Sequence, residues 1–102
     1  MRRRARTDAN QKKIIEQLRS IAGISVFPTH QLGSGFPDIA VGYRGRNYFF
    51  EIKNPDLYPS ERRLTEDEVK FFERWQGQVD EVLYVEDILE VLGLTVMDND
   101  SN

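Results

Sequence analysis

Two short motifs decide the fold of this chain: Gly33-Ser34-Gly35-Phe36-Pro37-Asp38, and Glu51-Ile52-Lys53 after the aromatic run Tyr48-Phe49-Phe50. The first is a glycine-rich turn that leads to an acid at the head of a strand. The second is a strand that is aromatic and then abruptly charged. Charges in a half-buried strand cost free energy unless they are paired, so these charges are where we look for function.

The residues between the motifs predict a β-hairpin, with strands at 38–43 and 47–53 around Arg44-Gly45-Arg46. Side chains alternate between faces, so a two-residue loop puts Asp38 on the same face as Glu51 and Lys53. A three-residue loop separates them unless a bulge intervenes. The opposite face is expected to pack on the core and carries Ile39, Val41, Tyr48, Phe50 and Ile52.

A basic arm precedes the first periodic pattern. Its arginines could contact phosphates without reading sequence, or could serve only as a solubility tail; they are Arg2, Arg3, Arg4 and Arg6. We expect residues 1–6 to be flexible. At the other end, the acidic, polar tail at residues 97–102 is expected to be disordered. One domain at residues 7–96 remains.

The N-terminal side of the domain predicts a helix, then a strand. Thr7 or Asp8 can cap a helix whose apolar residues repeat at helical spacing before a glycine stop. Gln11 falls in the middle of its apolar face. Residues 24–29 predict a strand that lies at a sheet edge or is ending, because it contains a proline. His30 follows, as a loop hydrogen-bonder or, less simply, as a phosphate contact.

A polar loop at residues 54–63 is expected to flank the site or to be partly disordered. Arg62 and Arg63 are candidates for phosphate contacts, although a solvated pair is the simpler interpretation. After the loop, Thr65 and Glu68 have the spacing of a capping box and predict a helix start.

The capped helix should run to a stop at Gly77, and its aromatic residues are most simply core: Phe71, Phe72 and Trp75. A short strand at 82–85 and a short helix at 86–92 follow. The element order is helix, three strands, helix, strand, helix. This order predicts an α/β or α+β fold with a mixed sheet flanked by helices.

Composition limits the function classes. The chain has no cysteine and one histidine, which excludes disulfides and sites built from several thiolates or imidazoles. It has no apolar run long enough to span a membrane and no signal-type segment, so we expect a cytoplasmic protein. Residues 1–53 carry ten basic and four acidic side chains, and residues 54–102 carry four and thirteen. The basic half suggests a polyanion partner, although charge can also segregate by chance.

The charged strand suggests a particular chemistry. Asp38 and Glu51 on one face would offer carboxylate oxygens to a hard divalent cation such as Mg²⁺, which binds through one or two carboxylates and keeps several waters. Lys53, on the same side, could stabilise a phosphorane-like anion or help deprotonate the attacking water. Two acids and a lysine around a metal predict a phosphodiesterase.

These residues resemble the signature of the PD-(D/E)XK nuclease superfamily, and the small size and Gly-Ser-Gly-x-Pro-Asp form resemble its VRR-NUC family and the archaeal-type Holliday junction resolvases. The resemblance implies a restriction-endonuclease-like α-β-β-β-α-β core. It implies that Asp38, Glu51 and the carbonyl of Ile52 bind Mg²⁺ or Mn²⁺, with Lys53 beside the nucleophilic water. Ser34 matches a serine that positions phosphate or water in the resolvases.

The same resemblance places a glutamate on the first helix, where this chain has Gln11, which could hold a metal-bound water without adding charge. It implies a metal-dependent DNA endonuclease of a bacterial cell or phage-infected host, acting on branched DNA as a homodimer. The alternatives are a nuclease for flap, nicked or linear duplex DNA, a catalytically silent nucleic-acid-binding module, and a structural or interaction domain in which the acids only form ion pairs.

Overall fold

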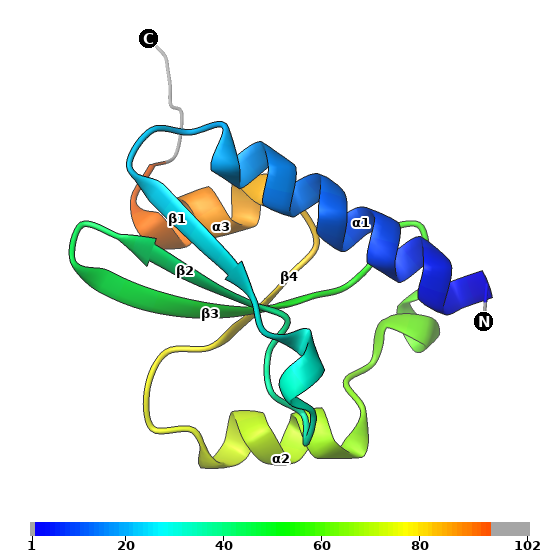
Figure 1. Ribbon diagram of the computed structural model, residues 1–102. Helices are drawn as coiled ribbons and strands as arrows, with labels where there is room; N and C mark the ends of the chain where they lie inside the picture. Colours follow the sequence, from blue (N-terminus) through cyan, green and yellow to red (C-terminus); the bar gives the residue numbers. More distant parts are fainter. Residues whose placement is uncertain (1, 95–102) are drawn as a thin grey trace, which may run out of the picture.

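A mixed sheet with helices on both faces forms the protein, in a computed structural model that describes residues 2–94, with side chains from residue 9 onward (Figure 1). The strands, in spatial order, are β1 (Ile24–Pro28), β2 (Ile39–Tyr43), β3 (Arg46–Ile52) and β4 (Asp80–Val82). Pairing is antiparallel from β1 to β3 and parallel between β3 and β4. The predicted mixed α+β architecture is confirmed, and β1 lies at an edge as expected.

The helices divide between the two faces. α1 (Arg2–Arg19) and α3 (Val85–Leu92) cover one face, and α2 (Glu66–Arg74) crosses the other (Figure 1). Two 3-10 turns, η1 (His30–Leu32) and η2 (Pro59–Arg62), lie in the loops. No helix among residues 2–94 is long and apolar enough to cross a membrane.

The face beneath α1 and α3 carries the aliphatic core. Every second residue of β2 and β3 points into it, and four of these side chains are at most 1% exposed: Ile39, Val41, Phe50 and Ile52. They cluster with buried residues of the two helices, among them Leu18 and Ile88 at 0% exposed. The predicted core face of the hairpin is confirmed.

The hairpin turns through two residues, Arg44 and Gly45, with φ of 53° and 76°. Left-handed values at both positions are those of a type I′ turn, which matches the twist of the strands. Tyr43 therefore pairs with Arg46, and Ile39 pairs with Phe50. This is the register predicted for a two-residue loop.

The opposite face carries an aromatic cluster beneath α2. Phe36 lies edge-on to Phe49 and Phe71, with ring centroids 5.3 and 5.2 Å apart, and Trp75 stacks on Phe71 at 5.0 Å. Trp75 is 38% exposed, however. The prediction that Trp75 is a core residue therefore holds only in part: its ring packs in the aromatic cluster, but part of it is open to solvent, because α2 alone covers this face.

The start of α2 is set by a capping motif in the sequence, whereas the start of α1 is not. Thr65 and Glu68 form the predicted reciprocal capping box of α2, although the helix ends at Arg74, short of the predicted stop. α1 begins at Arg2, so the predicted cap at Thr7 or Asp8 is wrong. The backbone of residues 2–6 is helical and continues α1, and the expected flexibility of this arm stays a prediction.

The last strand also departs from the prediction. β4 occupies Asp80–Val82 rather than 82–85, since Phe50 to Ile52 of β3 supply a parallel partner for that segment. Val85 instead opens α3, which ends at a left-handed Gly93. The predicted acidic tail at 97–102 lies outside the described residues.

Candidate active site

Asp38 stands where β2 begins, and Glu51 lies near the end of β3. The Asp38 N–H donates to the carbonyl of Phe50 at 3.0 Å, and its Oδ2 accepts from the N–H of Ile52 at 2.7 Å. The contacts of Asp38 therefore bracket Glu51 along β3. Asp38 is half-buried, and Glu51 is 3% exposed. The hairpin register thus brings two acids together in a partly dry environment.

Lys53 joins the two strands to α2. Its Nζ lies 3.4 Å from Glu51 Oε2 and donates to Glu68 Oε1 at 2.9 Å. The same Glu68 oxygen accepts from the N–H of Thr65 at 2.9 Å, as part of the capping box. The Glu68 carboxylate therefore both caps the start of α2 and binds the ammonium of Lys53.

Burial sets the charge state of this cluster. Burial first, and then the charge of Asp38, raises the pKa of Glu51 to about 10. Burial also raises the pKa of Asp38, against the opposing N–H of Ile52 and the charge of Lys53. Without a cation, burial and the neighbouring acid therefore favour the protonated form of Glu51.

The other two groups are held in their charged forms. Burial acts to lower the pKa of Lys53, but the hydrogen bond to Glu68 and the charge of Glu51 outweigh it and raise that pKa. Burial acts to raise the pKa of Glu68, but the Glu51 carboxyl, the Thr65 N–H and Lys53 together lower it. Lys53 is thus a fixed cation between acidic groups.

The donor set fits one hard cation. Glu51 Oε1 is buried and has no hydrogen-bond partner, which is costly unless a ligand satisfies it. The N–H of Ile52 points toward the β2 side and donates to Asp38 Oδ2. The carbonyl of a strand residue points to the same side as its N–H, so the Ile52 carbonyl also points toward β2. Residues 9–94 contain no group of three or more His, Cys, Asp or Glu side chains arranged for a metal. An ion here would rest on two carboxylates, a carbonyl and waters, as Mg²⁺ commonly does.

Gln11 lies on the buried side of α1, as predicted, and its described hydrogen-bond partner is His30. Gln11 is buried at 8% exposed, and its Nε2 lies 3.0 Å from Nδ1 of His30, the other candidate near the site. α1 packs over the aliphatic face, so the amide reaches the loop after β1, and no hydrogen bond to the acids is among its described contacts. Asn10 makes the link from α1 instead, donating to the carbonyl of Lys53 at 3.1 Å.

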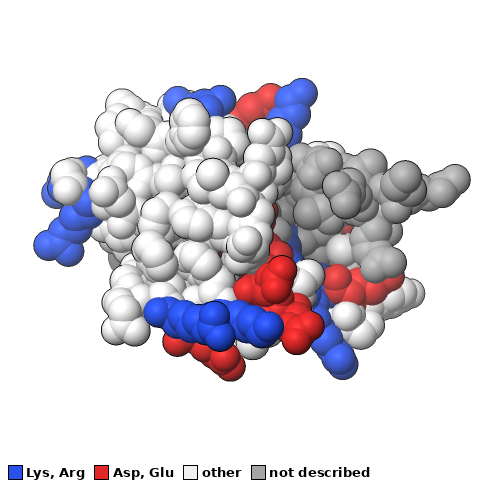
Figure 2. Space-filling view, turned by 60° about the horizontal axis from the view of Figure 1, so that its bottom comes forward, with Lys and Arg blue, Asp and Glu red and all other residues white. Residues whose placement is uncertain are grey.

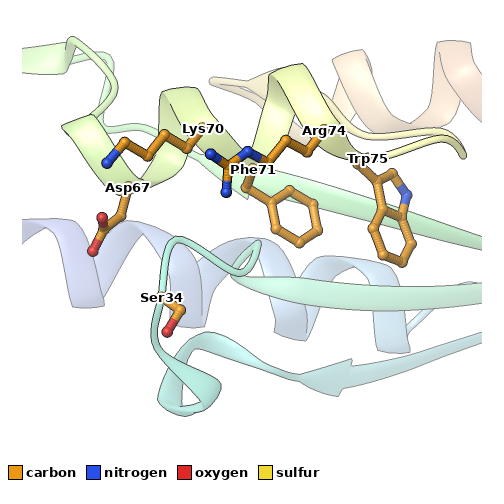
Figure 3. Close-up of a pocket in the computed structure, with 6 residues that line it drawn as sticks. All are labelled: Ser34, Asp67, Lys70, Phe71, Arg74 and Trp75. Atoms are coloured by element: carbon orange, nitrogen blue, oxygen red, sulfur yellow. The ribbon is translucent and has the colours of Figure 1, made fainter.

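The remaining candidates are spread over the surface. Ser34 is exposed beside α2, and its hydroxyl points away from that helix (Figure 3). Arg62 and Arg63 line a hollow together with two acids, Glu81 and Asp87. The N-terminal arginines lie in α1, with side chains outside the described set.

Glu68 is the site residue that sequence reasoning did not identify. Its spacing from Thr65 fitted a capping box, and that role was sufficient to explain it. An acid at the third position of a helix that follows the charged strand is a weak signal, because the crossing of α2 over β3 cannot be read from spacing. No sequence pattern indicated that Asn10 would contact the backbone of Lys53.

Comparisons with known proteins support the fold. No protein-family model matches the chain, and no curated protein matches it. A solved structure described as a VRR_NUC domain matches with a TM-score of 0.53 and 23% identity, over 86% of this chain and 95% of that one. This likeness shows that the chain has the fold of a VRR_NUC domain.

Proposed function

We propose that this chain is a divalent-metal-dependent DNA endonuclease that hydrolyses phosphodiester bonds. One observation carries the proposal: Glu51, which is clustered with Asp38, has a buried oxygen, Oε1, without a hydrogen-bond partner, while its other oxygen lies 3.4 Å from the ammonium of Lys53. A structural domain gains nothing from placing the half-buried Asp38 beside the buried Glu51, because the two acids oppose each other's ionisation. The shared fold with a VRR_NUC domain supports the same conclusion.

Asp38, Glu51 and the carbonyl of Ile52 would hold Mg²⁺, or Mn²⁺ in its place. A bound divalent cation supplies Lewis acidity toward a phosphate oxygen. Lys53 keeps its proton at neutral pH because its pKa is raised. It therefore suits stabilisation of the charge that develops on the phosphate, rather than removal of a proton from water. Glu68 positions its ammonium.

DNA as substrate accords with the basic N-terminal half. The preference for branched DNA, and the homodimer that cutting both arms of a junction needs, rest on the resemblance to archaeal-type resolvases. A catalytically silent nucleic-acid-binding module is the second candidate. It is favoured by the protonated Glu51 and by the missing third acidic ligand among residues 9–94.

A cleavage panel tests the proposal. Four-way junction, flap, nicked and linear duplex DNA are incubated with Mg²⁺, Mn²⁺ or EDTA, using wild type, Asp38→Asn and Lys53→Met. Glu81→Gln is the matched control, because Glu81 pairs with Glu51 in the sheet but is exposed. We expect metal-dependent cleavage that falls at least about 100-fold in both site variants and persists in the control. Unchanged cleavage in both site variants contradicts the assignment, and salt-sensitive binding without cleavage favours the binding module.

A further inference from the structure

A hollow of about 420 Å³ lies between the glycine-rich turn and α2, on the face of the sheet that carries the acids (Figure 3). Its lining residues are Ser34, Asp67, Lys70, Phe71, Arg74 and Trp75. The volume is within the roughly 300–1,000 Å³ range of small-ligand sites. Gly35 fixes one wall, because a Cβ there would lie 2.2 Å from the carbonyl oxygen of Asp67. The turn and the helix are thus in direct contact.

An exposed indole forms one side of this hollow. Trp75 is 38% exposed, yet its ring is held by Phe71, stacked at an interplanar angle of 19°, and by the edges of Phe36 and Phe49. A rigid aromatic surface that is open to solvent is what a nucleic-acid base needs for stacking. The indole loses little freedom on binding, so the platform is preorganised.

Two cations form another side. Lys70 and Arg74 are one helical turn apart, and both side chains extend along α2 in the same direction (Figure 3). Lys70 has a loose ion pair with Glu66 at 3.8 Å, and Arg74 has no ion pair among the residues whose side chains are described. Figure 2 shows that this side of the molecule is largely uncharged and that a row of basic side chains lies next to acidic ones. Phosphate is the anion that two adjacent cations of this kind suit.

We propose that this hollow binds an unpaired nucleotide of the nucleic-acid substrate, with its base on Trp75 and its phosphate on Arg74 and Lys70. The inference rests on the proposed function for its substrate class. α2 links the two places, since Glu68 contacts Lys53 in the candidate active site and its neighbour Asp67 lines the hollow. A base paired inside a duplex is not free to stack here, whereas an unpaired base of a single-stranded flap is. The hollow therefore selects substrate structure.

Fluorescence of Trp75 tests the proposal directly, because it is the only tryptophan of the chain. The full chain is titrated in EDTA with an eight-residue thymidine oligonucleotide, a matched abasic oligonucleotide, a blunt duplex and inorganic phosphate. We expect the thymidine strand to change the emission and to bind about 5- to 150-fold more tightly than the abasic strand, the fold-change of one lost base stack. The duplex and phosphate should leave the emission nearly unchanged.

Variants locate the binding. In Arg74→Gln and in Lys70→Gln, the slope of log affinity against log salt should fall by about 0.7, the value for one lost phosphate contact to a single strand. Lys13→Gln, on the exposed side of α1, removes the same charge and should leave both the emission change and the slope as in wild type. Equal slopes in all three variants overturn the proposal.

Three further results overturn it: an equal response to the abasic strand, an equal response to the duplex, or thymidine binding seen by anisotropy of a labelled strand without any change in Trp75 emission. The titration involves no cleavage, so it is independent of the nuclease assignment. Asp38→Asn should retain the emission change. A protein that binds the thymidine strand at Trp75 but cuts no DNA contradicts the nuclease while leaving the hollow's assignment intact.

Discussion

The two faces of one sheet are built for different purposes. Beneath α1 and α3, β2 and β3 contribute four buried apolar side chains and two partly buried tyrosines to the core: Ile39, Val41, Phe50, Ile52, Tyr43 and Tyr48. Beneath α2, β3 presents Phe49 and Glu51, Lys53 follows directly after the strand, and the nearby Trp75 is partly open to solvent. A strand alternates its side chains, so β3 can stabilise the fold with one set and hold charge with the other. We infer that the face beneath α1 and α3, the closed face, stabilises the fold, and that the face beneath α2, the open face, carries the chemistry.

Adjacent phenylalanines of β3 give the largest expected difference. Phe50 is fully buried in the aliphatic core, whereas Phe49 is half-buried in the aromatic cluster. Phe50→Ala should lower the free energy of unfolding by about 3–5 kcal/mol, because it leaves a cavity that the core cannot fill. Phe49→Ala should cost clearly less. Urea denaturation measures both, and equal losses would remove the distinction between the faces.

The glycine turn gives the next effect. Gly35 has φ of 78°, and an added Cβ meets the Asp67 backbone at 2.2 Å, whereas Gly33 has φ of 77° with nothing within 4 Å. Gly35→Ala should cost about 2–4 kcal/mol from the left-handed backbone and the overlap together, and Gly33→Ala about 1–2 kcal/mol from the backbone alone. Thermal unfolding compares them. If the two variants are equally stable, the turn does not pack on α2 as described.

The buried acid should destabilise the metal-free protein. Glu51 has its pKa raised to about 10, so the unfolded chain ionises it from about pH 4.5 upward while the folded chain keeps it protonated. Its contribution to stability is therefore fully present below about pH 4.5 and is lost as pH rises toward 10. Glu51→Gln should be more stable than wild type by roughly 1–3 kcal/mol at pH 7–8 in EDTA.

The gain in Glu51→Gln should shrink toward zero near pH 4. Chemical denaturation at several pH values measures this dependence. Glu81→Gln, at an exposed position on the neighbouring strand, should show no such dependence on pH. A gain that is constant with pH contradicts the protonated state of Glu51.

The smallest effect concerns Glu68. A glutamine there can still accept from the N–H of Thr65, but it loses the charge that holds Lys53. Glu68→Gln should change stability by about 1 kcal/mol or less and lower kcat roughly tenfold, as expected for a positioning residue. Substrate KM should stay nearly constant.

Glu66→Gln is the control, since Glu66 is an exposed acid in the same helical turn. It should leave kcat unchanged. Equal kcat values in the two variants would mean that Glu68 serves only as a cap.

Local patterns predicted the open face's backbone but not its contacts. The start of α2 followed from Thr65 and Glu68, because a capping box depends on neighbours in sequence. The sequence placed the hairpin but left a two- or three-residue loop open, and the structure decides for two residues, Arg44 and Gly45. The second role of Glu68 and the exposure of Trp75 depend on how α2 crosses the sheet. Spacing along the chain carries no information on that crossing.

The first helix shows the same limit. Periodicity placed Gln11 correctly on the buried side, but its partner is His30, on a loop that packing brings near. The early start of α1 was unexpected because the arginines were interpreted only by charge, although arginine is also a good helix former.

Titration calorimetry with Mn²⁺ tests most directly whether the buried acids form a metal site. Performed at pH 7 in two buffers of different ionisation enthalpy, it reports both affinity and protons released. The account predicts that wild type binds one Mn²⁺ and releases close to one proton, from Glu51. It predicts that Glu51→Gln releases none and binds at least about tenfold more weakly, and that Glu81→Gln behaves as wild type. Mn²⁺ binding of equal strength in wild type and Glu51→Gln, without proton release, would contradict the account.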